Sequence, residues 1–200
     1  MEKRKLIIGL TGAMGSGKST VAAMLRKKGA AVLDADKISH GCLKKQTPTY
    51  NKIKKAFGKE ILAENGEINK KKLAEVVFSD KKSLRKLCGI IHPAVIKGIE
   101  QKAKKLANKV VVIDAPLLIE AGLTSQVDTL VVVAAKKDTC VKRSTRRLKI
   151  TKQEARRRLA EQMPLSEKVK YADFVIKNDG GLNITSKQVQ NLWKQVKGDN

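Results

Sequence analysis

Short, continuous apolar runs are the most regular feature of this 200-residue chain. Residues 6–10, 110–114 and 130–134 consist mostly of aliphatic side chains, without the alternation of polar residues that marks a half-exposed strand. Such runs predict the strands of a parallel sheet that is covered on both faces. Two shorter runs, at 31–34 and 174–176, are predicted to complete a sheet of five strands.

Between these runs the apolar spacing changes to that of helices. Residues 20–28 predict a helix with Val21, Met24 and Leu25 on one side and Gly29 at its C-terminal end. A last helix near the end of the chain is predicted from the spacing of Val189, Leu192, Trp193 and Val196. Strands that alternate with helices predict an α/β fold built on a doubly wound sheet.

Residues 38–106 separate the second and third strands by far more chain than one crossover helix requires. Their pattern is mostly helical, with turn signals at 46–48, at Gly58 and at 65–66, and with a helix start at 79–80. We therefore predict a helical subdomain inserted into the α/β core.

The first apolar run leads directly into a phosphate-binding motif. Gly12-x4-Gly17-Lys18-Ser19 has the spacing of a glycine-rich loop that enters a helix. Glycines let successive backbone N–H groups converge on a polyphosphate, and the helix that follows adds the positive end of its dipole. Lys18 is expected to reach the β- and γ-phosphates, and the Ser19 hydroxyl to bind Mg²⁺. The residues predicted to bind ATP here are Gly12, Ala13, Met14, Gly15, Ser16, Gly17, Lys18, Ser19 and Thr20.

Aspartates follow two of the predicted strands. Asp34 and Asp36 lie at the end of the second strand, and Asp114 ends the third. Ligands of doubly wound sheets bind beyond the carboxyl ends of the strands, where a carboxylate often organises Mg²⁺. Alternatively, Asp34 or Asp36 is the N-cap of a helix that begins near Lys37, and the sequence leaves open which of the two has that role.

Two further helices are predicted after the fourth strand. Asp138 or Thr139 is expected to cap a helix that runs to about Leu148. Thr151 and Glu154 form a capping box for a second helix, which stops before Pro164.

These two helices carry most of the arginines of the chain. Arg143 and Arg147 are spaced to share one helix face, as are Arg158 and Gln162 on the second helix. The pattern favours a movable basic flap over phosphate groups, because arginine binds phosphate through two parallel hydrogen bonds. A solvated basic helical hairpin is the alternative.

Composition narrows the class of protein. The formal net charge is +24, with 17 basic and 6 acidic residues in 44–105, and 13 basic and 4 acidic residues in 136–170. Such charge attracts phosphorylated ligands or nucleic acid, although a general lysine bias would explain part of it. The six aromatic residues form no clustered stacking platform, so no specific nucleic-acid binding is expected.

No run approaches the ~20 apolar residues of a membrane span. Three cysteines without paired spacing indicate free thiols and a cytoplasmic protein.

Taken in order along the chain, these motifs resemble the dephospho-CoA kinases. The resemblance extends from Ile8 to Val196. Its landmarks are the glycine-rich loop, Asp34-Ala35-Asp36, Phe57-Gly58, His92-Pro93, Pro116-Leu117-Leu118-x-Glu120, Arg143-x3-Arg147, Arg158-x3-Gln162 and Asn178. It implies a P-loop NTPase fold and an ATP-dependent phosphotransferase that phosphorylates the ribose 3′-hydroxyl of dephospho-CoA in the last step of coenzyme A synthesis.

The resemblance also implies a division of the chain and a set of residue roles. The nucleotide-binding core comprises residues 1–40, 107–137 and 171–200, the CoA-binding insertion residues 41–106, and the lid residues 138–170. In this scheme Asp36, Lys18 and Arg143 are catalytic, and Ser19 and Asp36 hold Mg²⁺. ATP further contacts Arg143, Arg147 and Asn178, and the acceptor substrate contacts Asp36, Lys70, His92 and Leu117. Lys70 stands where the family usually has arginine, so it keeps the charge without the bidentate geometry.

Alternatives remain at the level of function. Another small-metabolite or nucleoside kinase would share the same core. A GTP-dependent switch is disfavoured because Ala135, in Ala135-Lys136-Lys137-Asp138, cannot supply the amide that reads guanine. A nucleic-acid-binding ATPase is suggested only by net charge. The partners expected are ATP and dephospho-CoA, and the chain is expected to be a monomer or a weak homo-oligomer.

Overall fold

The computed structural model describes residues 5–78 and 80–198. The described chain forms two compact units: one contains residues up to Leu33 together with those from Leu106 onward, and the other is Asp34–Lys105. The second unit begins at Asp34, whereas the sequence analysis places the start of the insertion at residue 41. The reason is packing, because the helix that follows Asp34 packs against the long helix of the second unit.

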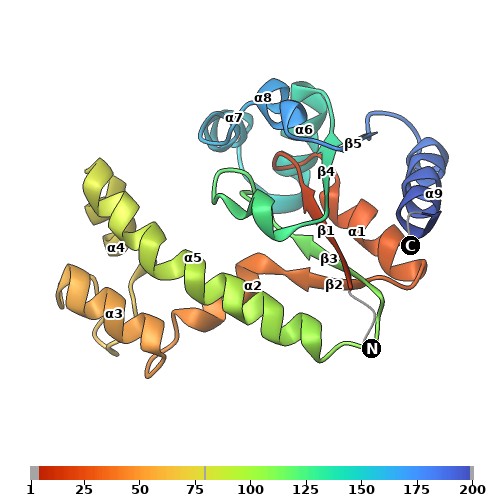
Figure 1. Ribbon diagram of the computed structural model, residues 1–200. Helices are drawn as coiled ribbons and strands as arrows, with labels where there is room; N and C mark the ends of the chain where they lie inside the picture. The colour runs from red at the N-terminus through yellow and green to blue at the C-terminus, as the bar shows by residue number, and fades with distance from the viewer. Residues whose placement is uncertain (1–4, 79, 199–200) are drawn as a thin grey trace. The chain divides into compact units, whose positions relative to one another are not determined.

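Five parallel strands form the centre of the first unit (Figure 1). In chain order they are β1 (Leu6–Thr11), β2 (Ala31–Asp34), β3 (Val110–Asp114), β4 (Thr129–Ala134) and β5 (Phe174–Lys177). Their order in the sheet is β2-β3-β1-β4-β5, which places β1 between β3 and β4. The prediction of a five-stranded doubly wound parallel sheet is confirmed.

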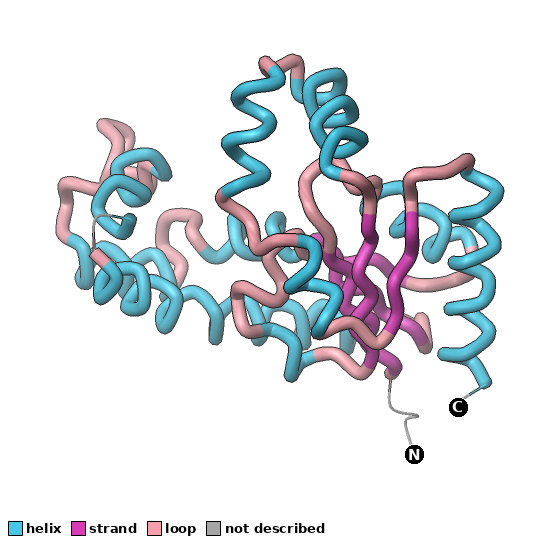
Figure 2. The backbone as a smooth tube through the Cα atoms, turned by 90° about the horizontal axis from the view of Figure 1, so that it is seen from above, coloured by secondary structure: helices cyan, strands magenta, loops and turns pink. Residues whose placement is uncertain are grey.

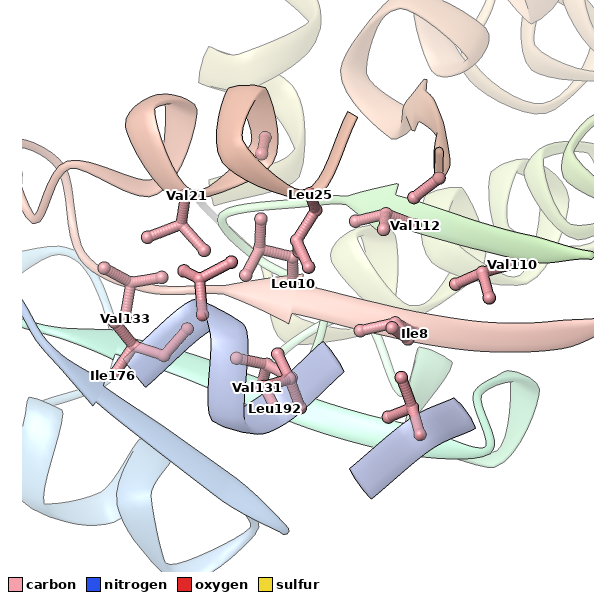
Figure 3. Packing of buried hydrophobic residues seen from close by; sticks show 14 residues of the cluster. Ile8, Leu10, Val21, Leu25, Val110, Val112, Val131, Val133, Ile176 and Leu192 are labelled. Carbon is pink, nitrogen blue, oxygen red and sulfur yellow. The ribbon is translucent and has the colours of Figure 1, made fainter. Parts of the chain in front are cut away.

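One face of this sheet packs against α1 (Lys18–Lys27) and α9 (Leu182–Gly198). Alternate residues of the strands point to this face, as a strand requires, and they meet the apolar sides of both helices. The labelled residues of this core come from both kinds of element (Figure 3): Ile8, Leu10, Val21, Leu25, Val110, Val112, Val131, Val133, Ile176 and Leu192. Helix α9 runs alongside the strands to the C-terminus (Figure 2).

The end of α1 follows its sequence prediction. Gly29 has φ +103, which an L-residue rarely adopts, and the chain reverses there. Its N–H donates to the Arg26 carbonyl at 3.0 Å, and the Ala30 N–H donates to the Leu25 carbonyl at 3.1 Å. This is the double hydrogen bond of a Schellman cap, so Gly29 ends the helix as predicted.

Residues after β3 and β4 supply the other helices of the first unit. A 3₁₀ helix spans Leu123–Gln126, and α6 (Lys137–Leu148) and α7 (Lys152–Ala160) pack against each other. Helix α8 (Leu165–Lys170) packs against β4. Leu118 and Leu123, which lie in the segment between β3 and β4, are also buried.

The start of α6 differs from its prediction. The N-cap residue is Lys136, and neither Asp138 nor Thr139 caps the helix. The chain is fixed two residues before Asp138, because the Lys136 N–H donates to the Asp179 carboxylate at 2.7 Å. Asp138 instead lies in the first turn, where its charge favours the helix dipole.

The N-terminus of α7 is as predicted, but its C-terminus is not. Thr151 accepts the Glu154 N–H at 3.1 Å, which is the cap that the sequence indicates. The helix ends at Ala160, so Gln162 lies beyond it and does not share a helix face with Arg158. Pro164 prevents continuation, and the chain begins the short helix α8, which the sequence analysis did not predict.

The second unit contains four helices among its described residues: α2 (Ala35–Cys42), α3 (Pro48–Phe57), α4 (Lys70–Phe78) and α5 (Lys81–Lys104). They enclose a separate apolar core of Ile53, Phe57, Ile61, Leu73 and Val77. Asp80 caps α5, as the sequence predicts, while Ser79 lies outside the described residues. Hydrogen bonds from the Lys82 and Ser83 N–H groups lower the pKa of Asp80.

None of the helices within 5–78 and 80–198 has the length and apolar character needed to span a bilayer.

Candidate active site at the end of strand β1

The loop between β1 and α1 has the backbone that its glycines allow. Gly12, Gly15 and Gly17 have φ values of +153, +80 and +90. A Cβ at Gly12 would lie 2.5 Å from the Val133 carbonyl oxygen, and one at Gly17 would lie 2.0 Å from Asn178 Nδ2. These two positions therefore exclude any side chain, both by conformation and by space.

Helix α1 presents an open N-terminus to this loop. Its N-cap is Gly17, which has no side chain to accept the first helical N–H groups, and its first turn contains no acidic residue. The unpaired amides at such a terminus attract anions. Ser19, the second residue of the helix, is exposed. This end of α1 can therefore receive phosphate.

Lys18 is paired in this structure. Its ammonium group donates to the carboxylate of Asp114, the last residue of β3, and both side chains are 17% exposed. The pair forms because β1 and β3 are in register, with Leu10 opposite Asp114. Lys18 thus lies beside the loop, and Asp114 is its present partner.

Two side chains from other elements hold the middle of the loop through one carbonyl. Asn178 Nδ2 donates to the Ser16 carbonyl at 2.7 Å, and Arg143 Nη1 donates to the same oxygen at 3.3 Å. Asn178 is buried, and its Oδ1 accepts the Thr185 hydroxyl at 2.8 Å. The sequence-predicted residues Arg143 and Asn178 are therefore brought together at the loop.

Helix α6 packs directly on the loop at Gly15. A Cβ there would lie 2.3 Å from the Cys140 carbonyl oxygen and 2.5 Å from Ser144 Oγ. The hydroxyls of Ser16 and Ser144 are buried and have no hydrogen-bond partner among the described residues. Unpartnered buried hydroxyls beside a glycine-rich loop are consistent with a polar ligand site, since buried polar groups are normally paired.

Other predicted residues of the first unit lie at its surface. Arg147 is exposed on α6, and Leu117 is 48% exposed after β3. Arg158 forms an ion pair with Glu154 at 2.7 Å. Gln162 has a contact that the sequence did not indicate: its Oε1 accepts the Met14 N–H of the loop at 2.9 Å.

The remaining predicted residues belong to the second unit. Asp34 caps α2 by accepting the Lys37 N–H at 3.0 Å, which answers the question that the sequence left open. Asp36 lies in the first turn of α2 and is exposed. Lys70 Nζ lies 2.9 Å from His40 Nε2, a neighbour that no sequence motif indicated. Burial lowers the pKa of His92, so the imidazole favours its neutral form.

A dedicated metal cage is absent from the part of the chain that the structure describes, where no three His, Cys, Asp or Glu side chains gather. Mg²⁺ that binds with a nucleotide needs no such cage, because it keeps several waters and takes one or two protein ligands together with phosphate oxygens. The Ser19 hydroxyl and the Asp36 carboxylate are oxygen donors of the required kind.

Comparison with known proteins identifies the family. A family model described as dephospho-CoA kinase matches residues 6–183. A dephospho-CoA kinase of Aquifex aeolicus is 46% identical over 193 residues, which cover 96% of this chain and 98% of the relative. The chain belongs to the dephospho-CoA kinase family.

Solved structures agree with this assignment. The dephospho-CoA kinase of Campylobacter jejuni is 28% identical and superposes with a TM-score of 0.67, covering 97% of this chain and 98% of that one. A Thermus thermophilus protein gives a TM-score of 0.84 at 32% identity, covering 96% of this chain and 98% of its own. A shikimate kinase of Acinetobacter baumannii, 16% identical with a TM-score of 0.54, shares the fold alone.

Proposed function

We propose that this dephospho-CoA kinase transfers the γ-phosphoryl group of ATP to the ribose 3′-hydroxyl of dephospho-CoA, giving CoA and ADP. The observation that carries the proposal is the loop between β1 and α1, where an open helix terminus lies beside Lys18 in a chain of this family. Phosphoryl transfer depends mainly on alignment and charge neutralisation, and the loop residues are suited to both tasks.

The amides of Gly12 to Thr20 bind the phosphate chain in this scheme. Lys18 exchanges its Asp114 partner for the β- and γ-phosphate oxygens. Asn178 and Arg143 both donate to the Ser16 carbonyl and so keep this oxygen turned away from the phosphate groups. A carbonyl oxygen that pointed at the phosphates would repel them, and the amides of the loop, the phosphate cradle, are left to face the anion. Asn178 therefore contributes to the nucleotide site by supporting the loop.

Ser19 and Asp36 are the residues proposed to hold Mg²⁺. Both are exposed, one at the second position of α1 and the other in the first turn of α2. When bound with ATP, the ion neutralises phosphate charge in the transition state. The chain itself supplies a hydroxyl and a carboxylate, which are the oxygen donors that Mg²⁺ prefers.

Asp36 is also proposed to accept the proton of the 3′-hydroxyl. Its support comes from its place in the family motif Asp34-Ala35-Asp36, in which Asp34 has the capping role and the Asp36 side chain is exposed. In the second unit, Lys70 and His92 are proposed to contact the acceptor substrate, together with Leu117 of the first unit. Arg147 is exposed on α6, where it is proposed to bind ATP phosphates together with Arg143.

A coupled ADP-release assay with Mg²⁺, ATP and dephospho-CoA tests the function, with the product identified by mass. We expect turnover with dephospho-CoA and none with nucleosides. Transfer to a nucleoside without transfer to dephospho-CoA would instead assign the chain to a different kinase class. Gel filtration under the same conditions tests the expected monomer or weak homo-oligomer.

The role of Asp36 has its own test. Asp36→Asn is expected to lower kcat by ~10²- to 10⁴-fold, the magnitude of general-base catalysis, with little change in ATP affinity. Asp34→Asn is the matched control, since asparagine caps a helix nearly as well as aspartate. A near-normal kcat for Asp36→Asn would remove the residue from this role.

A further inference from the structure

Lys168 is fully buried, which is unusual for a lysine in any fold. It lies on α8, outside every motif that the sequence analysis singled out. Its ammonium group donates to Glu120 Oε1 at 2.6 Å and to the Pro116 carbonyl at 3.0 Å. The charge is therefore satisfied by two acceptors from the segment that follows β3.

Both acceptors have a second donor: one donor directly precedes the phosphate-binding loop, and the other directly follows Gln162, a residue whose side chain contacts the loop. The Pro116 carbonyl also accepts the hydroxyl of Thr11, the residue directly before Gly12, at 3.1 Å. Glu120 Oε1 also accepts the Met163 N–H at 3.2 Å. Met163 follows Gln162, the residue whose side chain accepts the Met14 N–H of the loop.

The segment that carries Gln162 has little regular structure of its own. It lies between the end of α7 at Ala160 and the start of α8 at Leu165. On the α7 side its backbone is held by the Gln162 N–H, which donates to the Leu159 carbonyl at 3.3 Å, and on the α8 side by the contact from Met163 to Glu120. Without the Met163 contact, only the α7 side would hold the backbone from which the Gln162 side chain reaches Met14.

A contribution to the free energy of unfolding does not by itself account for the ion pair of Lys168 and Glu120. Lys168 is fully buried and the Glu120 side chain is 23% exposed. Such a pair often contributes little net free energy, because the desolvation of the buried ammonium group offsets the attraction, and apolar residues of similar volume can replace it. An apolar side chain could fill the space of Lys168, but it could not orient the Pro116 carbonyl and the Glu120 carboxylate. The pair is better explained by the geometry that it imposes.

We propose that Lys168 is a positioning residue for ATP binding. Through Glu120 and Met163 it fixes Gln162, and Gln162 in turn fixes the Met14 amide and the shape of the phosphate cradle. The proposal rests on the proposed function in that ATP is the ligand of the loop.

Lys168→Met tests the proposal through the affinity for ATP. We expect Kd and KM for ATP to rise ~10- to 100-fold, the scale of a small misplacement in a preorganised site. KM for dephospho-CoA should change little. Gln162→Ala should give a similar loss, and the double variant Lys168→Met/Gln162→Ala should lose no more than the worse single variant, since both act through one contact. The proposal would be overturned if the losses of ATP affinity in the two single variants multiplied in the double variant. It would also be overturned if Lys168→Met raised only the KM for dephospho-CoA.

A second variant separates positioning from folding. Glu120→Gln/Lys168→Met removes both charges, so its melting temperature should lie close to that of the wild type. Its KM for ATP should remain raised, and recovery of KM together with the melting temperature would refute a positioning role. Lys170→Met is the matched control, because Lys170 pairs with Glu167 on the same helix but is 67% exposed. It should match the wild type in both measurements.

These measurements remain informative if the proposed acceptor is wrong. Binding of a fluorescent ATP analogue reports the effect of Lys168 without any transfer to dephospho-CoA. Failure of the wild type to phosphorylate dephospho-CoA, with normal binding of the analogue, would count against the proposed function alone. Unchanged analogue binding in Lys168→Met would count against the positioning role alone.

Discussion

Single residues of the phosphate-binding loop were predictable when their role follows from backbone geometry. Gly12 and Gly17 adopt left-handed conformations and leave no room for a Cβ, as the motif spacing implies. The partner of Lys18 was not predictable in this way. The sequence placed Asp114 at the end of a strand, where a carboxylate often organises Mg²⁺. Its pairing with Lys18 depends on the register of β1 and β3, which no local pattern encodes.

The Lys18–Asp114 pair leads to a prediction about ATP binding without metal. Asp114→Asn removes a negative charge beside the phosphate site and frees Lys18. Calorimetric titration in EDTA should show about tenfold tighter ATP binding, which corresponds to the ~1.5 kcal/mol of one charge-assisted hydrogen bond. Asp138→Asn, at an exposed position of α6, serves as the control for net charge. Unchanged affinity in Asp114→Asn would show that Asp114 does not compete with phosphate.

Whole elements were predicted well where their pattern is determined by burial. The three central strands, β1, β3 and β4, are continuous apolar runs and are mostly buried, and all five strands lie where the sequence indicated. The region 161–170 was predicted poorly. Helix α8 has only six residues, and its buried lysine is stabilised by partners distant in the chain, so no local signal marks either feature.

Helix α7 carries a prediction about pH. Hydrogen bonds from Arg157 and Arg158 lower the pKa of Glu154 to about 2, against an ordinary value of 4.5. Since the folded-state pKa is lowered, the pairing stabilises α7 above about pH 4.5 and is lost as the pH falls toward 2. An NMR titration of the Glu154 carboxyl carbon should show this midpoint. In Arg157→Gln/Arg158→Gln the midpoint should return toward 4.5. A wild-type midpoint already near that value would contradict the assignment.

At the scale of the molecule, the sequence indicated an insertion and a basic chain, but not where the insertion begins. Asp34 was expected within the core because it ends a strand; its contacts instead group it with the helices of the second unit. Function was predictable on the ATP side from the loop alone. On the acceptor side it required the family resemblance, because Lys70 and His92 form no motif that the chemistry of single residues would reveal.

Because the chain has two compact units, we expect ATP and dephospho-CoA to slow amide hydrogen exchange in different parts of it. A non-hydrolysable ATP analogue should slow amide hydrogen exchange in α1, which begins with Lys18, and in the middle of α6, which carries Arg143. Dephospho-CoA alone should slow exchange within Asp34–Lys105, the unit that contains Lys70 and His92. Exchange measured by mass spectrometry checks both patterns. Protection by dephospho-CoA confined to the first unit would contradict the proposed acceptor contacts.

The contact between Gly15 and α6 has a practical consequence for following the enzyme at work. Cys140, whose backbone carbonyl makes that contact, is buried, and burial raises the pKa of its thiol, so the thiol should resist alkylation while α6 stays packed on the loop. Cys42 and Cys88 are partly exposed and would react first. With those two replaced by serine, the rate at which a maleimide dye labels Cys140 would report how often α6 separates from the loop, with no cysteine added to the chain.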